Sequence, residues 1–561
     1  MDRHRPALTR SRALLLATPP LAFLGLFFLW PVANILALGL APDGDVDLGA
    51  ITAAWRQPFV ADVVLFTLGL AMVSTLLTVL LGMPAAWVLA RFEFPGRRAL
   101  RALTVVPFVL PTVVVGSAFL ALLGPRSPVN AMAELLLGAD VPQVRLDGSA
   151  AAIVVAHVFY NVAVIIRLVG GMWAHLDPRA EEAARILGAS AWRAFREISW
   201  PLLRPAVISA ASIVFLFTVT SFGVVLLLGG PRDTTLEVEI YRQTAILLDL
   251  PTAAALTILQ MGGVLVLLLA SARAQERLAI QQRLRASGET ARRPRRGREG
   301  LVVGVIIAAT ALFMLVPLLV LVERALAGSA GYGLDAFGAL LAEDPRTRLA
   351  AAPVASVLDS LLFATLTTLI AGSLGLLAAA AVGYRSGWLS RGVDALVMLP
   401  LGTSAVIVGF GFLVSLDTPP LDLRTSVLLI PIAHALIALP FVLRAVVPVI
   451  RAIDDRLREA AAVLGASPSR AWREIDAPIL ARGALVGAGF AFAVSLGEFG
   501  ATLFIARPDT VTIPVAIYRL LGQPGAANFA TAMALATVLM LLTAVIMLCT
   551  ERLRGSGPQV F

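Results

Sequence analysis

Lysine is absent from this 561-residue chain, so arginine carries its basic charge apart from four histidines. A P-loop ATPase needs the lysine of G-x-x-x-x-G-K-[ST] to reach the nucleotide phosphates, so this chain does not hydrolyse ATP by that route. Cysteine is nearly absent as well. The single Cys549 excludes an internal disulfide framework and a cysteine-ligated metal site.

Charge is scarce, at 14 % of residues, while 58 % are hydrophobic and the mean hydropathy is +0.87. A soluble protein has about 25 % charged residues. So few charges cannot cover a globular surface, which excludes a cytosolic enzyme, a disordered scaffold and a secreted disulfide module. The net charge of +9 is compatible with nucleic-acid binding, but the arginines lie in short clusters between apolar runs. That pattern is typical of a polytopic membrane protein, with no nucleic-acid partner.

Apolar runs long enough to cross a bilayer recur along the whole chain, since a core of about 30 Å needs about 20 apolar residues. The first run is too long for the apolar region of a signal peptide, so we predict that it spans the membrane. Twelve spans are predicted: 13–40, 59–90, 101–123, 150–173, 202–228, 252–271, 301–327, 354–383, 392–415, 425–450, 479–505 and 527–549.

Arginine clusters mark every second loop and predict the orientation. They occur at the N-terminus, at 91–101, throughout 271–300 and after the last span, whereas the loop at 43–47 is acidic. The positive-inside rule then places both termini and the 271–300 linker in the cytoplasm. We interpret the linker as a solvated tether near anionic lipid, with specific lipid or partner binding as the alternative.

The chain contains an internal repeat. Residues 182–188 (EAARILG) match 459–465 (EAAAVLG) at an offset of 277 residues, which also pairs His157 with His434. Nearer the start of each half the offset is 293, as for Gly82 and Gly375, so the first half carries an insertion around 124–149. Six spans per half give both halves the same orientation. We therefore predict an all-α integral membrane protein of two parallel homologous six-helix halves, 1–270 and 301–561.

The most informative segments are the loops 177–201 and 454–478, which hold no spanning run yet read as helices. Asp177 is placed to cap a first helix, and Gly188 and its copy Gly465 are natural helix stops. Ser190 and Ser467 are placed to cap a second short helix in each loop. Ala184 lies one turn before Gly188, which predicts a smooth face that another protein's backbone can approach. The other interpretation, an amphipathic connector lying on the membrane, explains less well why both copies share residue types and spacing.

These loops resemble the EAA loop of ABC importer permeases, whose pattern is E-A-A, three residues, G, nine residues, I-x-L-P. The leucine of the pattern is replaced by Trp200 and Ala477. The resemblance covers nearly the whole chain and implies a permease subunit, not an enzyme, in which each loop docks on a separate ATPase subunit. The docking residues it implies are Glu182, Ala183, Ala184, Gly188, Glu459, Ala460, Ala461 and Gly465.

The fused two-half form further resembles the permeases for thiamine and for ferric iron. The stretches 156–161 (AHVFYN), 228–231 (LGGP) and 234–237 (TTLE) are most similar to the thiamine type. The motif at 495–502 (SLGEFGAT) is shared with sulfate, molybdate and ferric iron permeases, so it does not discriminate. The resemblance implies two ATPase copies and an extracytoplasmic binding protein, and it favours thiamine or its phosphates over ferric iron.

Glu498 and its repeat counterpart Ser221 are candidate residues of the translocation pathway. An acid inside a span costs about 2.5–3.5 kcal/mol on insertion scales, so Glu498 should face the bundle interior or water. A hydrogen-bonded structural acid is the alternative. For His157 and His434, structural hydrogen bonding is the better interpretation, because no carboxylate or cysteine lies at ligand spacing and we expect no metal or other cofactor.

An ion-driven secondary transporter is the alternative from a different class, because such proteins also contain internal repeats. They usually need intramembrane acids or discontinuous helices for the coupling ion. Here the acids are scarce and the duplicated motif is predicted to be cytoplasmic, which favours the importer. Neither H-E-x-x-H nor G-x-S-x-G occurs, so we predict no catalytic residue.

Overall fold

The computed structural model describes residues 10–41, 45, 47–125, 127–138, 145–278, 291–328, 331–343, 349–384, 387–417 and 421–554. Within these ranges nearly all regular structure is helical, as predicted, apart from a two-stranded antiparallel pair, β1 (Ala327–Gly328) and β2 (Gly331–Tyr332). Part of the predicted linker, residues 279–290, lies outside the described ranges.

Ten described helices are long and apolar enough to cross a membrane, or up to twelve if two bent helix pairs each count as one span. The bent pairs correspond to the predicted runs 101–123 and 392–415. The helices of the first pair meet at 104° and those of the second at 94°. Pro111 explains the first bend, because proline donates no N–H and forces the preceding residue into an extended conformation. At the second, Ser404 starts a new helix by accepting the N–H of Ile407 at 3.2 Å.

Two predicted spans end earlier than the hydropathy suggests. The run 202–228 breaks after Val219, and the run 479–505 breaks after Gly497; each is followed by a short separate helix. Hydropathy alone does not detect these breaks, because the few polar residues at them, such as Ser221 and Glu498, are flanked by long apolar stretches.

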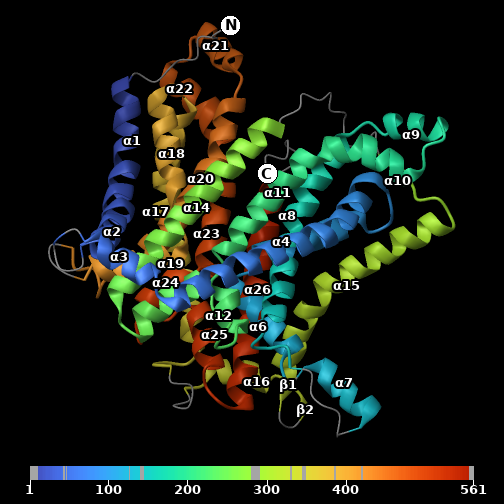
Figure 1. Cartoon of the computed structure of the whole chain (residues 1–561). Helices are drawn as coiled ribbons and strands as arrows, with labels where there is room; N and C mark the ends of the chain where they lie inside the picture. Colours follow the sequence, from blue (N-terminus) through green and yellow to red (C-terminus); the bar gives the residue numbers. More distant parts are fainter. Residues whose placement is uncertain are drawn as a thin grey trace. The chain divides into compact units, whose positions relative to one another are not determined.

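The described chain forms two compact units. Unit 1 comprises 1–52, 240–258 and 325–561, and unit 2 comprises 53–239 and 259–324. In unit 1, helices α17, α20 and α23 pack against one another (Figure 1). The helices of unit 1 are α1 (Arg10–Leu24), α2 (Trp30–Leu40), α16 (Asp335–Gly338), α17 (Val354–Gly383), α18 (Trp388–Gly402), α19 (Ala405–Ser415), α20 (Leu429–Ala452), α21 (Asp455–Val463), α22 (Pro468–Ala471), α23 (Ala477–Gly497), α24 (Gly500–Ile505), α25 (Ile513–Leu521) and α26 (Ala526–Arg554), with π-helical turns at Gly25–Leu29, Arg242–Ile246 and Trp472–Asp476 and a 3-10 turn at Ala339–Leu341.

In unit 2, helix α4 packs against α8 and α11 in the same way. Four helices cross the boundary between the units: α3 (Leu48–Trp55), α13 (Leu236–Tyr241), α14 (Leu250–Leu278) and, by its last two residues, α15 (Arg298–Leu326). The other helices of unit 2 are α4 (Pro58–Arg91), α5 (Arg97–Val109), α6 (Thr112–Leu123), α7 (Pro128–Leu137), α8 (Ala150–His175), α9 (Arg179–Ile186), α10 (Ala191–Ala194), α11 (Trp200–Val219) and α12 (Gly223–Leu228), with a π-helical turn at Phe195–Ser199.

The compact units do not follow the predicted halves 1–270 and 301–561, because the first span of each half packs on core helices of the other. Within unit 1, α1 packs on α17 and α2 packs on α19. Within unit 2, Phe313 of α15 contacts Phe159 of α8, with ring centroids 5.9 Å apart. The halves therefore describe the sequence repeat, whereas tertiary packing groups the first spans differently.

Aliphatic side chains cover the outward face of these helices. On α4, Leu65, Leu76 and Leu80 are each more than 60 % exposed. Monomeric soluble proteins rarely expose continuous apolar surface of this kind, whereas a lipid-facing helix requires it.

Candidate functional site

The first loop, 177–201, opens with helix α9. Asp177 Oδ1 accepts the N–H of Arg179 at 3.1 Å, which caps the first turn. At the other end Gly188 adopts φ +93°, the left-handed region that glycine enters without a steric penalty. The N–H of Ala189 then bonds to the carbonyl of Ala184 at 3.0 Å, and the N–H of Gly188 to that of Arg185 at 3.1 Å. This pair of bonds is a Schellman motif, and it ends the helix.

The second loop, 454–478, repeats this geometry. Asp454 caps α21 by accepting the N–H of Arg456 at 3.0 Å. Gly465 adopts φ +80°, and the N–H of Ala466 bonds to the carbonyl of Ala461 at 2.9 Å. The predicted glycine stops are therefore confirmed in both loops, with matching hydrogen bonds.

A second short helix follows in each loop and leads into the next span. Ser190 and Ser467 cap these helices, as predicted, by accepting the N–H three residues on. One turn later an exposed ion pair recurs, Arg193–Glu197 at 3.1 Å and Arg470–Glu474 at 2.9 Å. Solvent screens exposed pairs of this kind, so capping and chain geometry define the loop more than these charges do.

Six of the predicted docking residues are exposed: Glu182, Ala183, Gly188, Glu459, Ala460 and Gly465. Ala184 and Ala461 are only half-exposed, so the smooth face predicted from small residues is partly turned inward. A Cβ added at Gly188 or Gly465 would meet nothing within 4 Å. Both glycines are therefore required by their positive φ, and not by close packing inside the chain.

Sequence reasoning missed an exposed aliphatic pair directly before each glycine. Ile186 and Leu187 are 86 % and 88 % exposed, and Val463 and Leu464 are 88 % and 86 % exposed. The repeat ILG and VLG contained the signal, since apolar side chains preceding a helix stop at both copies are unexpected on a solvated loop. Two adjacent aliphatic side chains at the tip of a capped helix form a small apolar surface that a protein partner can bury.

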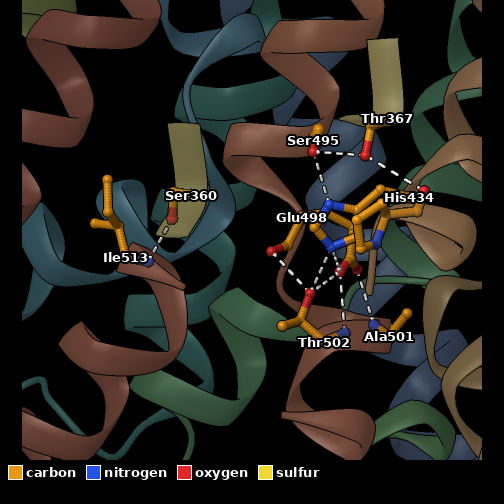
Figure 2. Close-up of polar contacts among 9 residues, drawn as sticks. Ser360, Thr367, His434, Ser495, Glu498, Ala501, Thr502 and Ile513 are labelled. Atoms are coloured by element: carbon orange, nitrogen blue, oxygen red, sulfur yellow. Dashed lines mark hydrogen bonds and ion pairs between the residues drawn. The ribbon is translucent and has the colours of Figure 1, made fainter. Parts of the chain in front are cut away.

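The buried histidines form a second repeated feature. His434 lies in α20 and is completely buried; its Nδ1 contacts Ser495 Oγ and its Nε2 contacts Thr502 Oγ1, both at 2.7 Å (Figure 2). His157 is likewise buried in α8, with Ser74 Oγ at 3.3 Å and Ser221 Oγ at 2.8 Å from its ring nitrogens. Each imidazole therefore links helices through hydroxyl groups, which confirms the structural interpretation.

Glu498 stands at the break between α23 and α24 and is 7 % exposed. Its Oε1 accepts the N–H of Ala501 at 2.8 Å, and its Oε2 accepts that of Thr502 at 3.0 Å (Figure 2). Oε2 also lies 3.2 Å from His434 Nε2. The carboxylate thus occupies the N-terminus of α24, where free amide groups and the helix dipole stabilise negative charge. At the matching position Ser221 is half-buried and bonds to His157.

These features define a polytopic helical membrane protein that contains a loop and a buried histidine cluster, each present in two copies. The chain belongs to the family of binding-protein-dependent transport system inner membrane components, whose model matches residues 78–280 and 371–554. It is therefore a transport subunit of the multi-pass, inner-membrane ABC permease type, and the double match agrees with the predicted repeat.

The thiamine transport system permease protein ThiP of Brucella abortus (strain 2308) is 29 % identical to this chain over 558 residues, covering 97 % of both chains. ThiP of Escherichia coli (strain K12) is 27 % identical, covering 90 % of this chain and 91 % of that protein. The molybdenum transport system permease protein ModB of Azotobacter vinelandii is 36 % identical over 179 residues, which cover 31 % of this chain and 76 % of ModB.

Proposed function

We propose that this chain forms the translocation pathway of an ATP-driven importer for thiamine or its phosphates, with one ATPase subunit docked on each repeated loop. The duplicated loop geometry carries this proposal. Two helices with the same caps, the same Schellman stop and the same exposed aliphatic pair supply two equivalent docking sites. A chain without a P-loop lysine needs such sites for separate ATPase subunits.

The solute assignment is supported by similarity to ThiP along almost the full length of both chains. Ferric iron remains the alternative from motif resemblance, and the similarity to ModB adds molybdate as a solute to test. A binding protein on the outer face would deliver the solute, as the family description implies. Both termini would lie in the cytoplasm.

In the proposed mechanism the permease has two conformational states, and both the ATPase and the binding protein shift the equilibrium between them. Closure of the ATPase dimer around ATP pulls on both loops and turns the cavity outward, while the loaded binding protein favours the same state. Each ligand shifts the equilibrium only by its differential affinity for the two states, and the coupling is reciprocal. Glu498 and Ser221 remain predicted positions along the pathway. A Ser221→Cys variant that reacts with a soluble thiol reagent during turnover would support this role.

The docking proposal is tested by placing a charge on the exposed aliphatic surface. We expect Leu187→Asp and Leu464→Asp each to reduce co-purification of the ATPase, and the double variant to abolish it, while membrane insertion is unchanged. Leu135→Asp is the control, since Leu135 of α7 is 85 % exposed but lies outside both loops. Normal ATPase association of the double variant would contradict the docking assignment.

The solute is tested in a strain that cannot synthesise thiamine. Deletion of the gene should abolish growth at low external thiamine and uptake of labelled thiamine. Unchanged thiamine uptake together with reduced ferric iron or molybdate uptake would replace the solute assignment and leave the importer assignment intact. In proteoliposomes, transport driven by an ion gradient without ATP would instead favour a secondary transporter.

A further inference from the structure

Three side chains occupy matching repeat positions around the first helix of each loop and the ends of two spans. The first position lies at or just after the end of the span that precedes α5 or α18. The second position lies in the first helix of the loop, α9 or α21. The third position lies directly before the span α11 or α23. The offsets of 293 and 277 residues pair Arg91 with Tyr384, Glu181 with Arg458, and Ser199 with Asp476. We call these sets the first-loop anchor and the second-loop anchor.

The second-loop anchor is a two-point ion pair with aromatic cover. Arg458 Nε donates to both carboxylate oxygens of Asp476 at 3.0 Å, and Nη2 donates to Oδ1 of the same carboxylate; Asp476 is 2 % exposed. Arg458 Nη1 also donates to Asp455 at 2.7 Å. The Tyr384 ring lies 5.6 Å from the guanidinium carbon, and its hydroxyl donates to Asp476 at 3.5 Å. The hydrogen bond to Asp476 raises the pKa of Arg458, so the guanidinium stays protonated.

The first-loop anchor uses different chemistry at the same positions. The Ser199 hydroxyl donates to the Glu181 carboxylate, so a neutral donor stands where the second loop has a carboxylate. Arg91 is 7 % exposed and donates to the Leu176 carbonyl at 3.1 Å, but its Nη2 has no hydrogen-bond partner among the described residues. Burial raises the pKa of Glu181, against the opposing effect of Arg91.

The difference bears on how firmly each loop helix is held. A guanidinium–carboxylate pair with two hydrogen bonds defines both distance and orientation, because the two planar groups align. A single hydroxyl–carboxylate bond defines distance alone and leaves rotation free. Removing one partner of a buried pair leaves an uncompensated charge, so the second-loop anchor also resists separation more strongly.

We propose that the two anchors are positioning elements that transmit movement of the loop helices to the spans, and that the second-loop anchor transmits it more rigidly than the first. The inference rests on the proposed function, in which an ATPase subunit docks on each loop. Two otherwise similar loops would then contribute unequally to transport, with the second loop dominant.

The test compares matched substitutions in the purified complex of permease and ATPase. Arg458→Gln breaks the second-loop anchor, Glu181→Gln weakens the first, and Arg470→Gln is the control because its exposed ion pair stays within the loop. The measurements are ATPase co-purification and the amount of solute transported per ATP hydrolysed in proteoliposomes. We expect all three variants to retain the ATPase. Transport per ATP should fall at least five-fold in Arg458→Gln and less than two-fold in Glu181→Gln, and it should be unchanged in Arg470→Gln.

A transplant variant separates positioning from mere stability. The triple substitution Tyr384→Arg, Arg458→Glu and Asp476→Ser installs the first-loop set in the second loop, and should recover only part of the transport per ATP that Arg458→Gln loses. Equal losses in Arg458→Gln and Glu181→Gln, or no loss in either, would overturn the inference. So would a transplant that folds and retains the ATPase but either matches the wild type or stays as uncoupled as Arg458→Gln. Failure of the wild-type chain itself to retain an ATPase would instead refute the proposed function.

Discussion

Two glycines at equivalent helix crossings provide a sharp test of the packing. Gly375 of α17 faces α20, and a Cβ added there would lie 2.6 Å from Val442 Cγ1 and 2.7 Å from Val442 Cβ. Gly82 of α4 faces α8, where the same atom would lie 2.8 Å from Ile165 Cβ. Val442 and Ile165 are themselves repeat counterparts, so both halves use the same close approach.

The expected magnitude follows from these distances. Carbon atoms in contact are about 3.5–4.0 Å apart, so Gly375→Ala requires α17 and α20 to separate by roughly 1 Å. A rotamer change does not relieve the clash, because the nearest atoms include Cβ of Val442. Overpacking of this kind costs about 1–3 kcal/mol. In a membrane, close packing of small residues is a main source of helix association, so little compensates for the loss.

The matched control lies one turn away on the same helix. A Cβ at Gly372 would meet nothing within 4 Å, so Gly372→Ala should be neutral or stabilise the helix by roughly 0.5–1 kcal/mol. On α4, a Cβ at Gly69 would likewise meet nothing within 4 Å. The assay is SDS-induced unfolding of the purified chain, followed by tryptophan fluorescence. Equal stability of the Gly372→Ala and Gly375→Ala variants would refute the close-crossing argument.

Three further predictions concern the loop, the buried histidines and the orientation. Gly465→Leu should reduce ATPase association, since a left-handed conformation costs a non-glycine residue roughly 1–2 kcal/mol. The effect of Gly465→Asn should be milder, and equal effects of the two variants would contradict the backbone argument. His434→Ala should destabilise the chain more than His157→Ala in the same SDS assay, because it removes a contact to the buried Glu498 carboxylate as well as two hydroxyl contacts, at about 0.5–1.5 kcal/mol per hydrogen bond; the reverse order would contradict this. Cysteines placed at Ser287 and Ser329, both outside the described residues, should react with an impermeant reagent from opposite sides, and labelling of both in intact cells would contradict the predicted topology.

The sequence by itself was enough to predict an all-helical membrane protein with two repeated loops. Span lengths follow from bilayer thickness, and the ends of the loop helices follow from local rules: Ser190 and Ser467 cap, and Gly188 and Gly465 stop. These signals depend on residues a few positions apart, so they can be read without knowing what packs where. The offset between the two loops was equally visible in one dimension.

Only the tertiary structure decided which side chains meet across long separations. The pairing of Arg458 with Asp476, and the clash expected at Gly375, depend on how helices cross, which no periodicity encodes. The breaks after Val219 and Gly497 were hidden because long apolar stretches flank the few polar residues at each break. The exchange of first spans between halves was hidden for a related reason. An apolar face does not specify which of two homologous cores it will cover, so packing decides.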